Sequence, residues 1–281
     1  MRLKPLIEPG SAIGKAFAGA AAQRRFVFFA GLPGVGKSLL IQQFALSAAA
    51  RARQVHLVRW DVVRTVFESH PAAAPFAEEA GQTHPVIRAA AGAWMRGALR
   101  RWHLAHPGPA DLLVGETPLL GNRFLAPSRR ERDPAEDLLG PESAEFFVPV
   151  PSIAVRQGIE LARRRDTARP RHALERANAD PELLTGLWRE IERACAALGI
   201  PAGPPGSGYR PEVYAALFGR VLRARRHAVL SIDELLPVEI SAQELGKHTR
   251  ELVPGDGEVA SALSEVDERA AETAARDWFL G

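Results

Sequence analysis

Apolar residues along the chain fall into short runs of strand length, and longer stretches of helical composition separate these runs. Five runs read as buried strands: residues 26–30, 54–60, 111–115, 145–150 and 227–232. The clearest helical stretch covers about 85–106. Strands that alternate with helices are typical of a parallel sheet with helices on both faces, so we expect an α/β fold.

The segments outside this alternation are polar or helical. A polar connector, 122–143, follows the third strand, and an Arg-rich helical insertion, 152–226, follows the fourth. A Pro/Gly loop at 200–208 interrupts the insertion. Residues 261–280 predict one surface helix whose end docks through Trp278 and Phe279. We expect a single domain, 1–281, in which 152–226 is a helical lid and insertion.

Composition narrows the class of protein only modestly. A chain of 281 residues with 46% hydrophobic residues can build one large domain with a sizeable core. The net charge of +3 is too mild to indicate nucleic-acid binding by itself. Nearly all cations are arginines, so the few lysines stand out: Lys4, Lys15, Lys37 and Lys247.

Cysteine use and the absence of long apolar runs suggest a cytoplasmic protein. Cys195 is the only cysteine, which excludes a disulfide framework and a Cys-based metal site. A single buried thiol fits a reducing compartment. The N-terminal stretch lacks the apolar core of a signal peptide, and no apolar run reaches 18 residues. We expect no membrane partner.

The most informative motif follows the first strand. Residues 31–38 read GLPGVGKS and match G-x-x-x-x-G-K-[ST], the phosphate-binding loop pattern. Glycines let consecutive N–H groups curl around phosphate oxygens, and the start of the next helix adds its positive end. Lys37 would reach the β- and γ-phosphates, and Ser38 would ligate Mg²⁺. The expected nucleotide-binding residues are Gly31, Pro33, Gly34, Val35, Gly36, Lys37, Ser38 and Leu39.

Acidic residues end three of the predicted strands: Asp61, Glu116 and Asp233. Ligands of parallel α/β sheets bind at these strand ends. Asp61 could orient or deprotonate an acceptor hydroxyl while Arg64, one turn later, clamps an anionic group. The alternative is that Asp61 caps a helix and Arg64 is solvated.

Glu116 and Arg123 are further candidates beside the same edge of the sheet. Glu116 could hold Mg²⁺ through water or act as a second base, or it could merely cap a turn. Arg123 would meet the acceptor or the nucleotide.

The Arg-rich stretch 155–176 supplies a third set of candidates. Phosphoryl transfer requires charge stabilisation and exclusion of water, which a flap bearing arginines would provide. Arg163 and Arg169 are the residues that we select as catalytic, together with Lys37 and Asp61. The alternative is that these arginines lie on solvated helix faces.

In these features the chain resembles the P-loop kinase group, which includes nucleoside monophosphate kinases, adenylylsulfate kinase, chloramphenicol phosphotransferase and zeta-toxin-like kinases. The resemblance rests on GLPGVGKS, on Asp61 with Arg64, on Glu116 and on the Arg-rich stretch. It implies a five-stranded sheet of order 2-3-1-4-5. It also implies ATP and Mg²⁺ as cofactors, an acceptor beside Asp61, and lid arginines on the phosphates.

Two other functions remain open. Asp233 and Glu234 follow an apolar run, as in ATPases that place Mg²⁺ and water on such a pair, although they lie far from Lys37 in sequence. A toxin-like or nucleic-acid kinase is the third possibility. Trp94, Trp102 and Trp188 lie in helical patterns that favour the core over base stacking, so a small-molecule acceptor is expected and the oligomeric state is not indicated.

Overall fold

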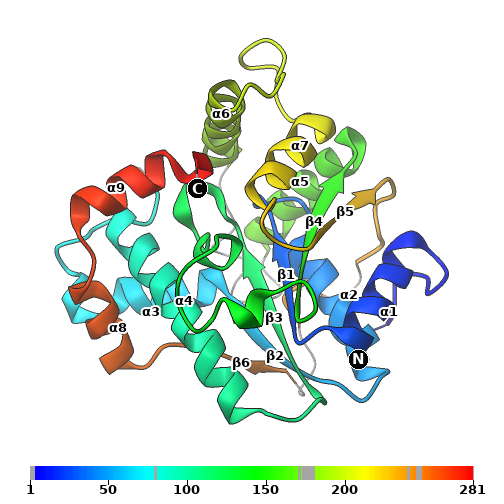
Figure 1. The fold of residues 1–281 in the computed structure, drawn as a ribbon. Coiled ribbons are helices and arrows are strands. Elements are labelled where there is room, and N and C mark those ends of the chain that lie inside the picture. Colours follow the sequence, from blue (N-terminus) through cyan, green and yellow to red (C-terminus); the bar gives the residue numbers. More distant parts are fainter. Residues whose placement is uncertain are drawn as a thin grey trace.

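The structure is a computed structural model that describes residues 4–78, 81–169, 172, 181–238, 241–244 and 249–280. Its centre is a parallel sheet of six strands in the order β5-β4-β1-β3-β2-β6 (Figure 1). The strands are β1 (Phe26–Ala30), β2 (Gln54–Arg59), β3 (Asp111–Thr117), β4 (Ala144–Pro151), β5 (His227–Ile232) and β6 (Arg250–Glu251).

The α/β class, the five predicted strands and their order are confirmed, but the expected number of strands is wrong. The sixth strand, β6, pairs with β2 through His56 and Leu57. It contains two residues, which is too short for a hydrophobic alternation to reveal. Two strands also end at other residues than predicted. β2 ends at Arg59, one residue earlier, while β3 continues through Glu116 to Thr117.

Helices cover both faces of the sheet and form three layers (Figure 1). On one face, α1 (Ala12–Gln23) and α2 (Lys37–Ala49) bury an aromatic cluster. Phe17 of α1 meets Phe44 of α2 at 5.3 Å between ring centroids and Phe29 of β1 at 5.8 Å. Successive strand side chains point to opposite faces, so Phe28 of β1 instead stacks on Phe146 in the second core cluster.

The second core cluster joins the other face of the sheet to most remaining helices. It includes α3 (Trp60–Ser69) and α4 (Pro85–Ala105), the latter close to the helix expected at 85–106. Trp94, Trp102 and Trp188 are buried in this cluster, as their helical positions predicted. Among the described residues, no helix has the length and apolar character needed to cross a bilayer.

Within 152–226 the described residues form three α-helices: α5 (Ile153–Ala168), α6 (Pro181–Ala197) and α7 (Pro211–Val221). The loop expected at 200–208 is irregular, as predicted. Tyr214, Leu217 and Phe218 of α7 are buried in the core, so this helix is a structural part of the domain.

The C-terminal segment forms two helices where one was expected. These are α8 (Asp256–Ser264) and α9 (Glu268–Arg276). Asp267 starts α9 as its N-cap, because its carboxylate accepts from the N–H of Ala270 at 2.8 Å. The predicted docking of the end is confirmed, since Trp278 and Phe279 are buried.

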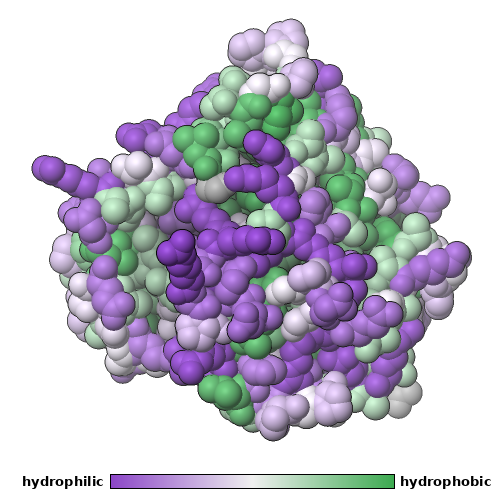
Figure 2. Space-filling view, in the orientation of Figure 1, coloured by the Kyte–Doolittle hydropathy of each residue, from purple (hydrophilic) through white to green (hydrophobic). Residues whose placement is uncertain are grey.

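The connector 122–143 lies over the face of the molecule seen in Figure 1, where the surface is mainly hydrophilic (Figure 2). Buried arginines hold it in place. Arg225 donates to Glu136, with 2.7 Å between Nη1 and Oε1, and Arg96 of α4 pairs with both Asp133 and Glu136. The connector is therefore fixed on the body of the domain by ion pairs.

Candidate functional site

The turn between β1 and α2 has the backbone shape that its glycines allow. Gly31, Gly34 and Gly36 have φ of 137°, 80° and 86°, values that residues with a Cβ rarely adopt. Gly36 is the N-cap of α2, which begins at Lys37, one residue earlier than expected. The predicted sequence of strand, glycine-rich turn and helix is therefore present.

Unpaired backbone donors line this turn. Within the described part of the chain, the N–H groups of residues 34–39 make no hydrogen bond. The first N–H groups of a helix have no intrahelical acceptor, and they point out along the positive end of its dipole. The turn therefore offers a concentrated set of donors to an anion.

Lys37 is buried beside these donors, with 5% of its surface exposed. Its Nζ donates to the carbonyls of Gly31 and Leu32 at 2.7 and 2.8 Å. It also lies 3.5 Å from Oε1 of Glu116 on β3. Burial lowers the pKa of Lys37 and raises the pKa of Glu116, while each partner's charge opposes the other's shift.

A cavity of about 1410 Å³ opens at the carboxyl ends of the strands. It exceeds the roughly 300–1,000 Å³ typical of small-molecule sites, so it has room for two ligands. Most of the predicted site residues line it: Pro33, Gly34, Gly36, Lys37, Ser38, Leu39, Asp61, Arg64, Glu116, Arg123, Arg163 and Arg169. The structure thus brings together segments that are far apart in sequence.

Two predicted loop residues do not line the cavity. Val35 is buried in the core, and Gly31 lies against Tyr214 of α7. A Cβ on Gly31 would lie 1.9 Å from the Tyr214 hydroxyl, which accepts a hydrogen bond from the N–H of Leu32. Gly31 therefore shapes the loop from behind.

Helix α5 lies over the glycine-rich turn. A Cβ on Gly34 would come within 3.3 Å of Nη1 of Arg163, and one on Gly36 within 3.7 Å of Cδ1 of Ile159. Burial lowers the pKa of Arg163, and the nearby carboxylates of Asp61 and Glu116 oppose this shift. Arg169, the other predicted arginine, is exposed at the end of α5 but still lines the cavity.

Asp61 stands on the first turn of α3, with 55% of its side chain exposed. Its Oδ1 accepts from Nε of Arg64 at 3.2 Å. Arg64 also pairs with Glu68 at 3.2 Å, so it is held by two carboxylates and is not the solvated side chain of the alternative interpretation. This arrangement leaves the Asp61 carboxylate accessible to a ligand in the cavity.

Four residues that the sequence did not reveal also contribute to the site. Tyr214 supports the turn, while Gln243 lines the cavity and donates from Nε2 to Oγ of Ser38 at 3.2 Å. Arg59 donates to Oε1 of Gln243 and pairs with Glu251 of β6. No short-range pattern could have found these contacts, because the partners are distant in sequence.

The protein carries no dedicated metal cluster among the residues that the structure describes. The Ser38 hydroxyl, at the start of α2 and on the cavity wall, is a group that could ligate a cation. Glu116 instead approaches Lys37 with one of its carboxylate oxygens, Oε1. The unpaired N–H groups and Lys37 fit a polyphosphate.

Comparison with known proteins gives no relative: no family model, curated protein or solved structure matches this chain.

Proposed function

We propose that the chain is an ATP-dependent phosphotransferase with a P-loop NTPase core, and that it moves the γ-phosphoryl group to a small acceptor. One observation carries the proposal. Unpaired N–H groups at 34–39 and the buried Lys37 open on the same cavity as an accessible carboxylate, Asp61, and a covering arginine, Arg163. A protein catalyses phosphoryl transfer mainly by positioning the reactants and by stabilising the charge of the transition state.

In the proposed reaction the acceptor hydroxyl attacks the γ-phosphorus as its proton passes to the Asp61 carboxylate. The bond between the γ-phosphorus and the β–γ bridging oxygen breaks, and ADP leaves with that oxygen. Lys37 and Arg163 would offset the charge that gathers on the transferred group and on the leaving oxygen. Mg²⁺, bound through Ser38 and the phosphates, would neutralise further phosphate charge.

The lining of the cavity includes apolar and polar groups that suit two ligands. On the side of α5 the walls include an apolar group, Val155, Ile159, Leu235, Pro237 and Val238, beside charged residues of the same helix. An apolar slot of this kind suits a nucleobase. On the other side lie Asp61, Arg64 and Arg123, which suit a polar acceptor.

Topology supports a kinase over an ATPase that uses Asp233 and Glu234. Both residues follow β5, and β4 lies between β5 and β1, the strand that leads into the turn. Glu234 lines the cavity beside the apolar slot, whereas Glu116 on the adjacent β3 is the carboxylate that reaches Lys37. No comparable observation favours a nucleic-acid acceptor.

A mass-spectrometric phosphorylation screen tests the proposal. Purified protein, ATP and Mg²⁺ are offered nucleosides, nucleotides, sugars and antibiotics, with Lys37→Ala as the inactive variant. Lys15→Ala, an exposed lysine on α1, is the matched control. We expect a phosphorylated product with wild type and Lys15→Ala only.

Asp61→Asn should lower transfer by about 10²-fold or more if Asp61 is the base. ADP release that depends on Lys37 but yields no product with any acceptor would support the ATPase instead. Normal turnover by Lys37→Ala would refute nucleotide binding at this loop.

A further inference from the structure

The loop that follows β3 is strained where it borders the acceptor end of the cavity. Leu119, Asn122 and Phe124 have φ of 65°, 69° and 52°, although none is a glycine. Such strain persists only where surrounding structure holds it, and it gathers at functional sites. Here Phe124 is buried edge-to-face against Trp60, and the N–H of Leu119 donates to the carbonyl of Arg123.

This strained loop presents the guanidinium of Arg123 to the cavity. Its Nη1 donates to the carbonyl of Leu120 at 3.0 Å, and its Nη2 donates to Oε1 of Gln82 at 2.8 Å. Both acceptors are neutral, and a guanidinium has five N–H donors. Arg123 is thus oriented but keeps donors for a ligand.

A second cation, Arg88, lies next to Arg123. A Cβ on Gly121 would sit 2.8 Å from Nη1 of Arg123 and 2.9 Å from Nη1 of Arg88, so the two guanidinium groups converge on one point. Arg88 donates to the neutral oxygens of Thr83, Gly121 and Gln82.

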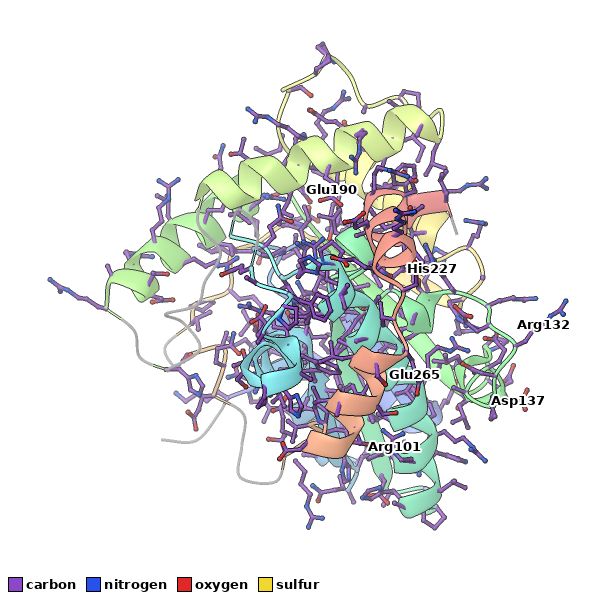
Figure 3. All side chains as sticks on the ribbon, turned by 90° about the vertical axis from the view of Figure 1, so that its left-hand side faces the viewer. Arg101, Arg132, Asp137, Glu190, His227 and Glu265 are labelled. Carbon is purple, nitrogen blue, oxygen red and sulfur yellow. The ribbon has the colours of Figure 1, made fainter. Side chains whose placement is uncertain are left out.

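The nearby carboxylate is Glu190, on the side of α6 that faces the body of the molecule (Figure 3). Its Oε1 would be 3.3 Å from the same Cβ. Burial lowers the pKa of Arg123 and raises the pKa of Glu190, so both groups lack full solvation. Two guanidinium groups, those of Arg123 and Arg88, thus lie around one carboxylate beside this end of the cavity.

We propose that the acceptor carries an oxyanion, a phosphate or a carboxylate, which binds Arg123 while the acceptor's hydroxyl faces Asp61. The planar fork of a guanidinium matches both oxyanions in a bidentate manner. Arg123, Arg64 and Asp61 line the same cavity, and Asp61 is close enough to influence Arg123 electrostatically. This inference rests on the proposed kinase function for assigning this end to the acceptor.

The first test measures an anion at this site without any turnover. The chain is saturated with the non-hydrolysable ATP analogue AMP-PNP and Mg²⁺, which fills the triphosphate position, and inorganic phosphate is titrated by calorimetry at constant ionic strength. We expect phosphate to bind, and Arg123→Gln to weaken it about tenfold or more, since it removes a charge-assisted contact. Arg164→Gln, an exposed arginine of α5 outside the cavity lining, is the matched control and should bind as wild type.

A second variant keeps the test valid if Arg123→Gln folds poorly. Glu190→Gln removes the carboxylate that competes with the ligand for Arg123, so phosphate should bind several-fold more tightly. No phosphate binding by AMP-PNP-loaded wild type, or binding that neither Arg123→Gln nor Glu190→Gln alters, would overturn the inference.

A failure of the proposed kinase function gives a different result from a failure of the inference about the acceptor. If AMP-PNP does not bind, the nucleotide proposal is refuted, and the same phosphate titration on the nucleotide-free chain still compares wild type with Arg123→Gln. When AMP-PNP does bind, transfer is assayed with matched acceptors: ribose 5-phosphate against ribose, and glycerate against glycerol.

We expect transfer to the anionic member of a pair, with Arg123→Gln raising KM for that acceptor while KM for ATP stays constant. Activity with ribose 5-phosphate alone identifies a phosphate group, and activity with glycerate alone identifies a carboxylate. Equal transfer to the neutral members would overturn the inference and leave the kinase proposal intact.

Discussion

The hydroxyl of Tyr214 accepts a hydrogen bond from the N–H of Leu32 across 3.0 Å, joining α7 to the glycine-rich turn. The contact is fully buried and spans much of the chain. It explains why Gly31 must lack a side chain, since a Cβ there would meet the same hydroxyl. A helix inside the predicted insertion therefore helps to shape the glycine-rich turn.

Tyr214→Phe should weaken nucleotide binding while preserving the fold. The change leaves the buried N–H of Leu32 without an acceptor, which costs about 1–3 kcal/mol. We expect a lower Tm and weaker AMP-PNP binding, measured by calorimetry. Phe218→Leu, a core change on the same helix, is the comparison: it should lower Tm with no comparable loss of affinity. Equal losses of affinity in both variants would contradict a specific role for the hydroxyl.

Glu116→Gln should shift the pH dependence of nucleotide binding. Burial lowers the pKa of Lys37, and the Glu116 carboxylate opposes that shift. In the proposed complex Lys37 binds the phosphates as an ammonium, so affinity should be lost as pH rises through its pKa. Without the carboxylate this pKa falls further, and the loss should begin at lower pH than in wild type.

The measurement for Glu116→Gln is the Kd of AMP-PNP across neutral to alkaline pH. Glu78→Gln, which removes an exposed carboxylate from the rim of the same cavity, should keep the wild-type profile. If the profile of Glu116→Gln coincided with wild type, Glu116 would not control the charge of Lys37.

Gln243→Ala should tighten the binding of Mg²⁺ in the nucleotide complex. The Gln243 amide donates to Oγ of Ser38, the oxygen on which we place the cation. Removing a donor that competes for the lone pairs of this oxygen should lower the Mg²⁺ concentration that gives half-maximal turnover. The turnover at saturating Mg²⁺ should change little. A higher Mg²⁺ requirement in Gln243→Ala would show that the amide supports the cation instead.

Glu136→Gln should reduce the loss of stability in acid. The pKa of Glu136 is lowered from 4.5 to about 2, and hydrogen bonds from Arg225 are the largest cause. A carboxyl whose pKa is lower in the folded state stabilises the fold above pH 4.5, and that contribution is lost as pH falls toward 2. We expect the free energy of unfolding, measured by chemical denaturation at several pH values, to fall less steeply with decreasing pH in this window for the variant. Asp137→Asn, the exposed neighbour labelled in Figure 3, should leave the slope unchanged.

Much of the framework was predictable because local patterns report local structure. Each apolar run that we interpreted as a strand is one, and the turn at 31–36 lies between β1 and α2. The failures share a physical cause. Strand β6 is too short to show a period, and the break between α8 and α9 depends on a cap by Asp267 inside a stretch of helical composition.

The sequence by itself determined the alternation of strands and helices, the glycine-rich turn with Lys37, and the acidic residues at the strand ends, because these depend on neighbouring residues and on backbone preferences. Only the tertiary structure decided which distant side chains meet: Tyr214 behind Gly31, Gln243 on Ser38, and Arg88 with Glu190 beside Arg123. Such contacts are set by how the helices and loops pack around the sheet, and no spacing along the chain encodes them.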